Sequence, residues 1–278
     1  QRGLLEVMKR QLLGIWMQSK GRSSRGRGAG RRASALKRFP CHKLSISYVP
    51  MLNPINFLVW NLRGASRPES IKYLCKLYLD NKVSLVFLLE PMSGVDQLDV
   101  VRRRLKLDHG SSFLNGKVWC LWSRSFKLSF LEGEDQVVHA RLTFPLGEVV
   151  NILTVYAKCT RVGRRPLWNC LEGFSVRVTE PWIVAGDFNV IASMEEHRGG
   201  RSANISNMEE FNSSMFTCGL SPMAFDGCPF TWKNGKGWQR LDRALINSRW
   251  AAEYLVTRVS HFPRYRSDHA PLLIKAGS

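Results

Sequence analysis

Six short segments of the sequence each place an oxygen-bearing or imidazole side chain beside an apolar run. The residues concerned are Asn61, Glu90, Tyr156, Asp187 with Asn189, Asp242, and Asp268 with His269. In a layered α/β domain the strand ends converge on a common crevice, so we expect these groups to meet at one rim. A single polar residue at a strand end is usually a turn or cap residue, but six segments together favour a functional site.

Asp242 gives the strongest indication that these groups interact. It stands in the apolar stretch RLDRALI, with Leu241 and Ala244 nearby. Burial of a carboxylate is costly unless the group is paired or binds a metal, and His269 is the expected partner. An imidazole that donates one N–H to Asp242 would be fixed in orientation, and its protonated form would be favoured.

The same side chains suit a metal ion. Carboxylate and amide oxygens, without cysteine or clustered histidine, are the ligands preferred by Mg²⁺ and Mn²⁺. An ion of this kind that keeps bound water, beside a His–Asp pair, suits the hydrolysis of a phosphate ester. The sequence therefore predicts a Mg²⁺- or Mn²⁺-dependent hydrolase.

The charge of the chain indicates a polyanionic partner. The 278 residues include 41 Lys or Arg against 22 acids, a formal net charge of +19. Residues 1–54 hold 12 of these cations and one acid, a net +11, which leaves +8 for the remainder. Nucleic acid is the first expectation for the partner and an anionic membrane the second.

Residues 1–54 are expected to form a separate, mostly disordered basic segment. The stretch SKGRSSRGRGAGRRASALKR, residues 19–38, has almost no large apolar residues and cannot offset the entropy of ordering. We place the boundary near Pro54, so that 55–278 is the folded domain. No run is long and apolar enough to cross a membrane, and no signal peptide is evident.

The seven cysteines include no C-x-x-C pair, so neither a disulfide framework nor a zinc site is indicated. A reducing, intracellular compartment is the default expectation, and a DNA substrate would make it nuclear. No feature of the sequence indicates an obligate protein partner.

From Ile55 onward, strand and helix patterns alternate. Apolar runs predict strands over 55–62, 83–90, 117–123, 137–144, 149–157, 181–190, 254–262 and 270–275. Helical periodicity predicts helices over 66–82, 95–106 and 207–220, and Asn234-Gly235 predicts a hairpin turn. Strands outnumber helices, so the simplest arrangement is a mixed α/β domain of two packed sheets with helices outside.

The segments WNLRG, LLEP, VYA, GDFN, RLDRAL and SDHAPLL, in this order, resemble the endonuclease/exonuclease/phosphatase superfamily. More closely, the chain resembles the endonuclease domain of plant LINE-type non-LTR retrotransposons, of which FTWKNGKGWQRLDRALIN is typical. The resemblance covers about 55–278. It implies a DNase I-like four-layer α/β sandwich of two packed mixed β-sheets flanked by helices. It also implies Mg²⁺-dependent cleavage of a phosphodiester.

The resemblance also implies roles for the residues. Asn61 and Glu90 match the residues that hold the metal, directly or through water, and Asp268 matches an acid near it. In the family, a second set of residues acts on the phosphate and the attacking water. The residues of this chain that match that set are Tyr156, Asp187, Asn189, Asp242 and His269. The identity of the general base stays open between Asp187 and His269.

One position departs from the pattern of the repair endonucleases in this superfamily. These carry an acid two residues after the first-motif Asn, where this chain has Arg63, so the number of metals, one or two, stays open. Arg63 could instead contact the DNA backbone. The other residues expected to contact nucleic acid are Trp232, Lys233, Lys236, Arg264 and Arg266.

The leading interpretation is a DNA endonuclease that nicks one strand. One alternative is a phosphatase of the same superfamily that acts on inositol or lipid phosphates. In inositol phosphatases the GD-x-N motif is typically followed by an aromatic residue and an Arg, but here Val190 and Ile191 follow. The other alternative is an inactive nucleic-acid-binding remnant of a retrotransposon.

Overall fold

The computed structural model describes residues 53–131, 135–200 and 202–277. The expectation of disorder for 1–54 therefore falls, except for its last two residues, outside the described residues. Helices in the described ranges are α2 (Pro68–Asp80), α3 (Val95–Leu105), α4 (Arg161–Ser175), α5 (Ile205–Thr217), α6 (Ser248–Glu253) and the 3₁₀ turn η1 (Met194–Glu196).

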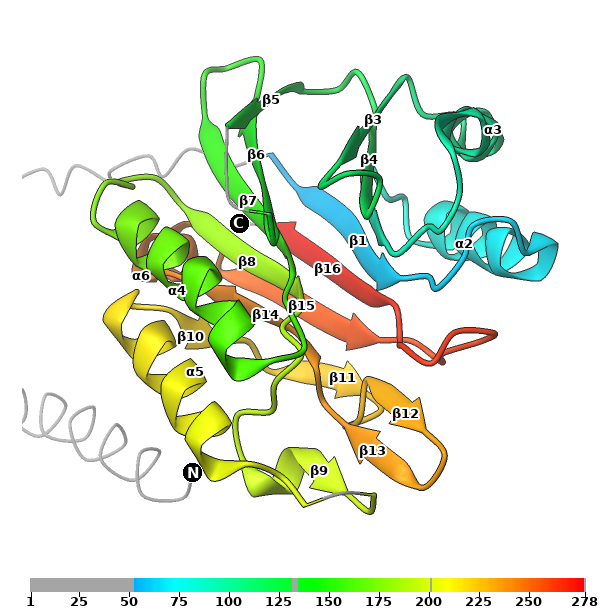
Figure 1. Ribbon diagram of the computed structural model, residues 1–278. Coiled ribbons are helices and arrows are strands. Elements are labelled where there is room, and N and C mark those ends of the chain that lie inside the picture. The colour runs from blue at the N-terminus through cyan, green and yellow to red at the C-terminus, as the bar shows by residue number, and fades with distance from the viewer. Residues whose placement is uncertain (1–52, 132–134, 201, 278) are drawn as a thin grey trace, which may run out of the picture. The chain divides into compact units, whose positions relative to one another are not determined.

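Strands in the described ranges form three sheets (Figure 1). The first eight strands are β1 (Ile55–Asn61), β2 (Leu85–Leu89), β3 (His109–Phe113), β4 (Val118–Trp122), β5 (Lys127–Leu131), β6 (Val137–Thr143), β7 (Val149–Tyr156) and β8 (Trp182–Asp187). The others are β9 (His197–Arg198), β10 (Ser221–Pro222), β11 (Phe225–Gly227), β12 (Trp232–Asn234), β13 (Gly237–Gln239), β14 (Asp242–Ile246), β15 (Val256–His261) and β16 (Leu272–Gly277).

The two large sheets both mix parallel and antiparallel pairs. The seven-stranded sheet has the order β11-β15-β16-β1-β2-β4-β3, in which β1 runs parallel to β2 and antiparallel to β16. The six-stranded sheet has the order β10-β14-β8-β7-β6-β5, in which β8 runs parallel to β7 and antiparallel to β14. The strands β12, β13 and β9 form a small third sheet.

The two large sheets pack face to face, with helices on both outer surfaces (Figure 1). Phe57 and Phe87 of one sheet share a buried apolar core with Ile152 and Ile183 of the other. The outer face of the seven-stranded sheet is covered by α2 and α3, and that of the six-stranded sheet by α4 and α5. The predicted four-layer α/β sandwich is confirmed.

Strand register places three polar residues side by side at one end of the six-stranded sheet. Tyr156 pairs with Asp187 across β7 and β8, and Asp187 pairs with Asp242 across β8 and β14. Ala185 and Ala244, two residues along their strands, face the core between the sheets. Because side chains alternate along a strand, Asp187 and Asp242 face the same interior space at its polar end.

Candidate active site

The seven-stranded sheet contributes a second set of polar residues to the same end of the sandwich. Asn61 ends β1 and pairs with Leu89 of β2, so that Glu90 follows immediately. The segment before β16 is fastened to this edge, because the Ser267 hydroxyl donates to the Asn61 carbonyl at 2.8 Å. The Trp60 indole donates to the His269 carbonyl at 3.1 Å, which holds His269 beside β1.

His269 is buried between two carboxylates. Its Nδ1 lies 2.8 Å from Oδ2 of Asp242, and its Nε2 lies 3.7 Å from Oδ2 of Asp187. Burial lowers the pKa of His269, but the charges of Asp242 and Asp187 outweigh it and raise that pKa to about 9. The predicted pairing of Asp242 with His269 is confirmed, and a protonated imidazole is its favoured state at neutral pH.

Asp187 sits at a point where the backbone itself is specialised. A side chain on Gly186, whose φ is +142°, would place a Cβ only 2.1 Å from the Val155 carbonyl oxygen, so the residue before Asp187 must be glycine. Asp187 accepts hydrogen bonds from the Asn189 backbone N–H at 2.9 Å and from Asn61 Nδ2 at 3.2 Å. Burial and the nearby Asp242 raise the pKa of Asp187 to about 6, although His269 opposes the shift.

Glu90 connects three of the predicted residues. Its Oε1 accepts from the Tyr156 hydroxyl at 2.7 Å and from Asn61 Nδ2 at 3.2 Å, and its Oε2 accepts from Arg63 at 2.8 Å. Burial and the carboxylate of Glu90 both raise the pKa of Tyr156, so the hydroxyl stays a donor. Glu90, Arg63 and Asn189 all have positive φ, at 44°, 53° and 50°. Such strain in non-glycine residues is typical of functional sites.

Asn189 is placed beside Asp187 by contacts of its own. Its Nδ2 donates to the Ala157 carbonyl at 2.7 Å, and its carbonyl accepts from the buried guanidinium of Arg164 at 3.0 Å. Every residue that the sequence predicts for metal binding or catalysis is thus found at this end of the sandwich.

Asn61 and Glu90 fit a hard divalent cation. The side-chain oxygen of Asn61 is buried and has no hydrogen-bond partner, which a cation would satisfy. The carboxylate of Glu90 lies on the nitrogen side of the same amide, 3.2 Å from Nδ2, and amide and carboxylate oxygens are the ligands that Mg²⁺ and Mn²⁺ prefer. Donor atoms of Asp187, Asp242 and His269 also lie within 4.8 Å of one another. However, Nδ1 of His269 is already hydrogen-bonded to Asp242, and the protonated imidazole that this pairing favours does not bind a cation. The side of Asn61 and Glu90 is therefore the better place for an ion.

Residues predicted to contact nucleic acid fall into three pairs. Arg63 donates to Asp268 as well as Glu90, and the indole of Trp232 donates to Asp268 at 3.2 Å, so both contact site carboxylates. Lys233 and Arg264 instead place their cationic groups over the ring of Trp238, at 4.4 Å and 4.6 Å from its centre. Two further exposed cations complete the predicted set, Lys236 in the hairpin turn and Arg266 in the loop before β16.

Sequence reasoning missed the small polar residues that hold the catalytic candidates. The Thr231 hydroxyl accepts from the backbone N–H groups of Leu241 and Asp242, at 3.0 Å and 2.9 Å. The Ser267 hydroxyl accepts from the His269 backbone N–H at 3.1 Å. The spacing of Ser267 and His269 is a known local turn pattern and was the one available signal.

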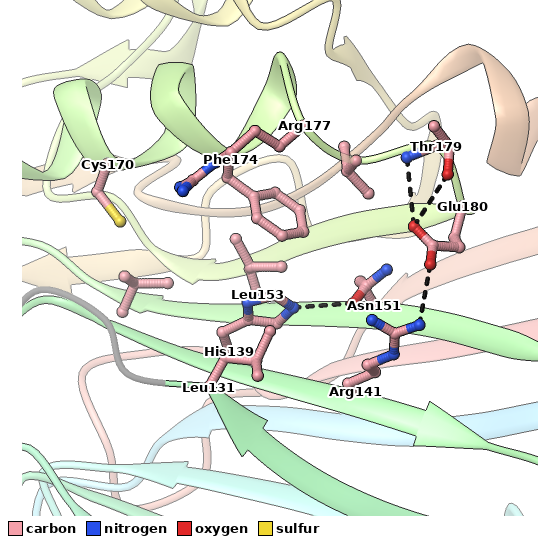
Figure 2. A pocket seen from close by; sticks show the side chains of 12 residues that line it. Leu131, His139, Arg141, Asn151, Leu153, Cys170, Phe174, Arg177, Thr179 and Glu180 are labelled. Carbon is pink, nitrogen blue, oxygen red and sulfur yellow. Dashed lines mark hydrogen bonds and ion pairs between the residues drawn. The ribbon is translucent and has the colours of Figure 1, made fainter.

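A separate cavity of about 400 Å³ lies between β6, β7 and α4 and shares no residue with this site (Figure 2). Figure 2 shows that its polar groups are paired with one another: His139 with Asn151 at 2.8 Å, and Arg141 with Glu180 at 3.0 Å. Burial lowers the pKa of His139, so the imidazole is neutral at pH 7. These satisfied pairs indicate a structural role for the cavity lining.

Solved structures of nucleases and related enzymes share this fold. The endonuclease domain of TRAS1, a telomere-specific non-LTR retrotransposon, is 11% identical with a TM-score of 0.61, covering 81% of this chain and 98% of that one. The AP endonuclease LMAP from Leishmania major is 16% identical with a TM-score of 0.61, covering 81% and 88%. The 3' phosphatase NExo from Neisseria, bound to a product DNA hairpin, is 16% identical with a TM-score of 0.61, covering 79% and 98%.

A search of curated proteins found no match to this sequence. The family model described as the endonuclease/exonuclease/phosphatase family matches residues 58–269, a span that includes every predicted metal-binding and catalytic residue. The chain belongs to the endonuclease/exonuclease/phosphatase family.

Proposed function

We propose that this protein is a divalent-metal-dependent DNA endonuclease that nicks one strand, derived from a LINE-type non-LTR retrotransposon. The observation that carries the proposal is the buried His269, held by Asp242 on one nitrogen and facing Asp187 with the other. Hydrolysis of a phosphodiester needs a group that takes a proton from water and a group that stabilises the charge on the phosphate. Asp187 and His269 supply these two groups.

The pKa values favour one assignment of the two roles. Asp187, with a pKa raised to about 6, is mostly ionised at pH 7 yet basic enough to accept a proton from water. His269, with a pKa raised to about 9, is a cation at that pH and suits stabilisation of the phosphoryl oxygens. We therefore assign Asp187 as the general base and His269 as the cationic group. Asn189 and Tyr156 flank the same space and would orient the phosphate.

Asn61 and Glu90 would hold the metal, with Asp268 as an additional ligand. A bound Mg²⁺ or Mn²⁺ would supply positive charge to a phosphate oxygen and to the leaving group. The protein's own contribution is to keep the oxygen of Asn61 unpaired and the carboxylate of Glu90 fixed by Tyr156.

A long polyanion fits the surroundings of the site better than a small phosphate does. The hairpin β12–β13 presents Lys233 and Lys236, and Arg264 stacks on the hairpin residue Trp238. Cations spread along a surface beside an aromatic ring are typical of contacts to a phosphate backbone. With DNA as the proposed substrate, we propose that the protein acts in the nucleus. Among the described residues, no helix has the length and apolarity that crossing a bilayer requires.

The decisive experiment is nicking of supercoiled plasmid by the full chain, with Mg²⁺, with Mn²⁺ and with chelator. We expect open-circular product only with metal, and its loss in Glu90→Gln, which keeps shape and removes charge. Release of phosphate from inositol phosphates, measured in parallel, would instead support a phosphatase. DNA binding without any hydrolysis would identify an inactive binder.

A further inference from the structure

Arg63 is held by Glu90 and Asp268, the two carboxylates proposed to bind the metal. Its Nη1 lies 2.8 Å from Oε2 of Glu90. Its Nη2 and Nε lie 2.9 Å and 3.0 Å from Asp268. A guanidinium and a divalent cation use the same carboxylate oxygens, so the two cannot be fully satisfied by Glu90 and Asp268 at once.

We propose that Arg63 is a built-in competitor for the divalent ion, and that its guanidinium must leave Glu90 before the ion binds. The inference rests on the proposed function, because it assigns the ion to the side of Glu90. It makes Arg63 a residue that tunes metal affinity, and through it the metal concentration at which the enzyme becomes active.

The contacts of Arg63 indicate which of its two carboxylate partners it releases. Arg63 makes one hydrogen bond to Glu90 but three to Asp268, so the Glu90 end is the weaker. The Oε1 atom of Glu90 is already engaged by Tyr156 and Asn61, which leaves Oε2, the partner of Arg63, as the oxygen to be freed. The carboxylate itself need not move for this exchange.

Arg63 also has space to move into. Its side chain is 40% exposed and lines a hollow of about 370 Å³ together with Arg67, Met92 and Arg266. A displaced Nη1 would therefore face solvent beside two other guanidinium groups, where a DNA phosphate can accept its hydrogen bond. An arginine side chain does not lose its proton in proteins, so the contact between Arg63 and Glu90 can be broken only by movement of the guanidinium.

The test is Mn²⁺ binding to the full chain without DNA, measured by electron paramagnetic resonance of the free ion. Replacing Arg63 by a neutral residue of similar length, in Arg63→Gln, removes the competing charge. We expect the Mn²⁺ dissociation constant to fall by about tenfold or more. Arg63→Lys keeps the charge but cannot donate to both carboxylates with the geometry of a guanidinium. Its Mn²⁺ dissociation constant should lie between those of the parent and Arg63→Gln.

Arg67→Gln is the matched control. It makes the same charge change in the same hollow, but Arg67 bonds to the Arg266 carbonyl rather than to a carboxylate. Its Mn²⁺ affinity should stay within about twofold of the parent protein, since a screened, more distant charge has a small effect. Glu90→Gln should lose the binding.

Thermal melting gives a second readout that does not depend on activity. Without metal, Arg63→Gln should melt earlier than the parent, because Glu90 and Asp268 repel each other without their shared counter-ion. Saturating Mn²⁺ should raise its melting temperature by more than it raises that of the parent.

Three outcomes would overturn the inference. Equal or weaker Mn²⁺ binding in Arg63→Gln would show that Arg63 organises the ligands rather than competing for them. An equal gain in Arg67→Gln would show a general field effect. A melting shift with Mn²⁺ no larger than the parent's would show that no competition is relieved.

The proposed function fails separately. If Arg63→Gln gains Mn²⁺ affinity but no form of the protein nicks plasmid, the endonuclease is excluded and the competition stands.

Discussion

His269 Nε2 and Asp187 Oδ2 lie 3.7 Å apart although their segments belong to different sheets. Asp187 ends β8 of the six-stranded sheet, and His269 precedes β16 of the seven-stranded sheet. The apolar packing between the sheets therefore sets the distance between the proposed base and the proposed cation. Neither sheet contains the site by itself.

Asp242→Asn tests whether His269 acts as a cation. The change preserves shape but removes the charge that favours the protonated imidazole, so nicking should fall by about 10²–10⁴. His269→Gln should cost about as much, and the double variant little more, because the two residues act as one unit. Single-turnover assays at low temperature keep the variants folded. The control is His139→Gln, a buried histidine outside the site, which should cut normally; equal loss there would point to instability.

Stability in chelator should fall as pH rises from 6.5 toward 9. The pKa of His269 is raised above its unfolded value of 6.5 to about 9, so the native state holds an extra proton in this window. The contribution of His269 to the free energy of unfolding is complete below pH 6.5 and is lost as pH passes 9, with a size on the order of 3 kcal/mol. Urea unfolding across this range measures it. His269→Gln should abolish the slope, while His139→Gln, whose pKa is lowered, should keep it.

Trp238→Leu tests the surface formed by the hairpin. Loss of the ring removes the platform under Lys233 and Arg264, so DNA affinity should fall by about threefold to tenfold. Phe216→Leu, at an exposed aromatic residue on α5, is the control and should bind DNA normally. Fluorescence anisotropy with a labelled duplex measures both. Unchanged binding by Trp238→Leu would remove the hairpin from the DNA interface.

Deletion of residues 1–52 tests the basic segment, whose net charge is +11. Each phosphate contact contributes about 0.9 to the slope of log affinity against log salt. Affinity at low salt should drop and the slope should flatten by several units, while the cleavage rate at saturating DNA stays the same. If the slope is identical with and without the segment, it does not contact DNA.

Local patterns were sufficient to predict the buried strands and the polar residues at their ends, but not the more exposed strands β3 and β5. β2 is apolar at all five positions because both of its faces are covered, and that run identified both the strand and Glu90 after it. Helix α4 was harder to recognise, because it carries Gly163 and Pro166 among arginines and its buried Leu167 and Leu171 are a weak periodic signal.

Contacts between distant side chains could not be predicted in the same way. Arg63 and Asp268 are 205 positions apart, and nothing in either segment shows that a guanidinium will bridge Asp268 to Glu90. Trp232 is predicted to contact nucleic acid, and the additional hydrogen bond from its indole nitrogen to Asp268 could not be foreseen from the hairpin sequence. The sequence motifs identified these residues as site candidates. Their hydrogen-bond partners depend on how the loops of the two sheets pack, which the sequence does not show.

The direct pairing of Asp242 with Asp187 across β14 and β8 makes the site sensitive to chain length. One residue inserted or removed between β13 and β14 would shift Asp242 by one position and turn its carboxylate toward the helical layer. The two-residue link Arg240–Leu241 is thus as constrained as the catalytic candidates, although neither of its side chains reaches them. The turn between β6 and β7 lies at the opposite end of the sheet from Tyr156 and carries no such constraint from the register of β8 and β14.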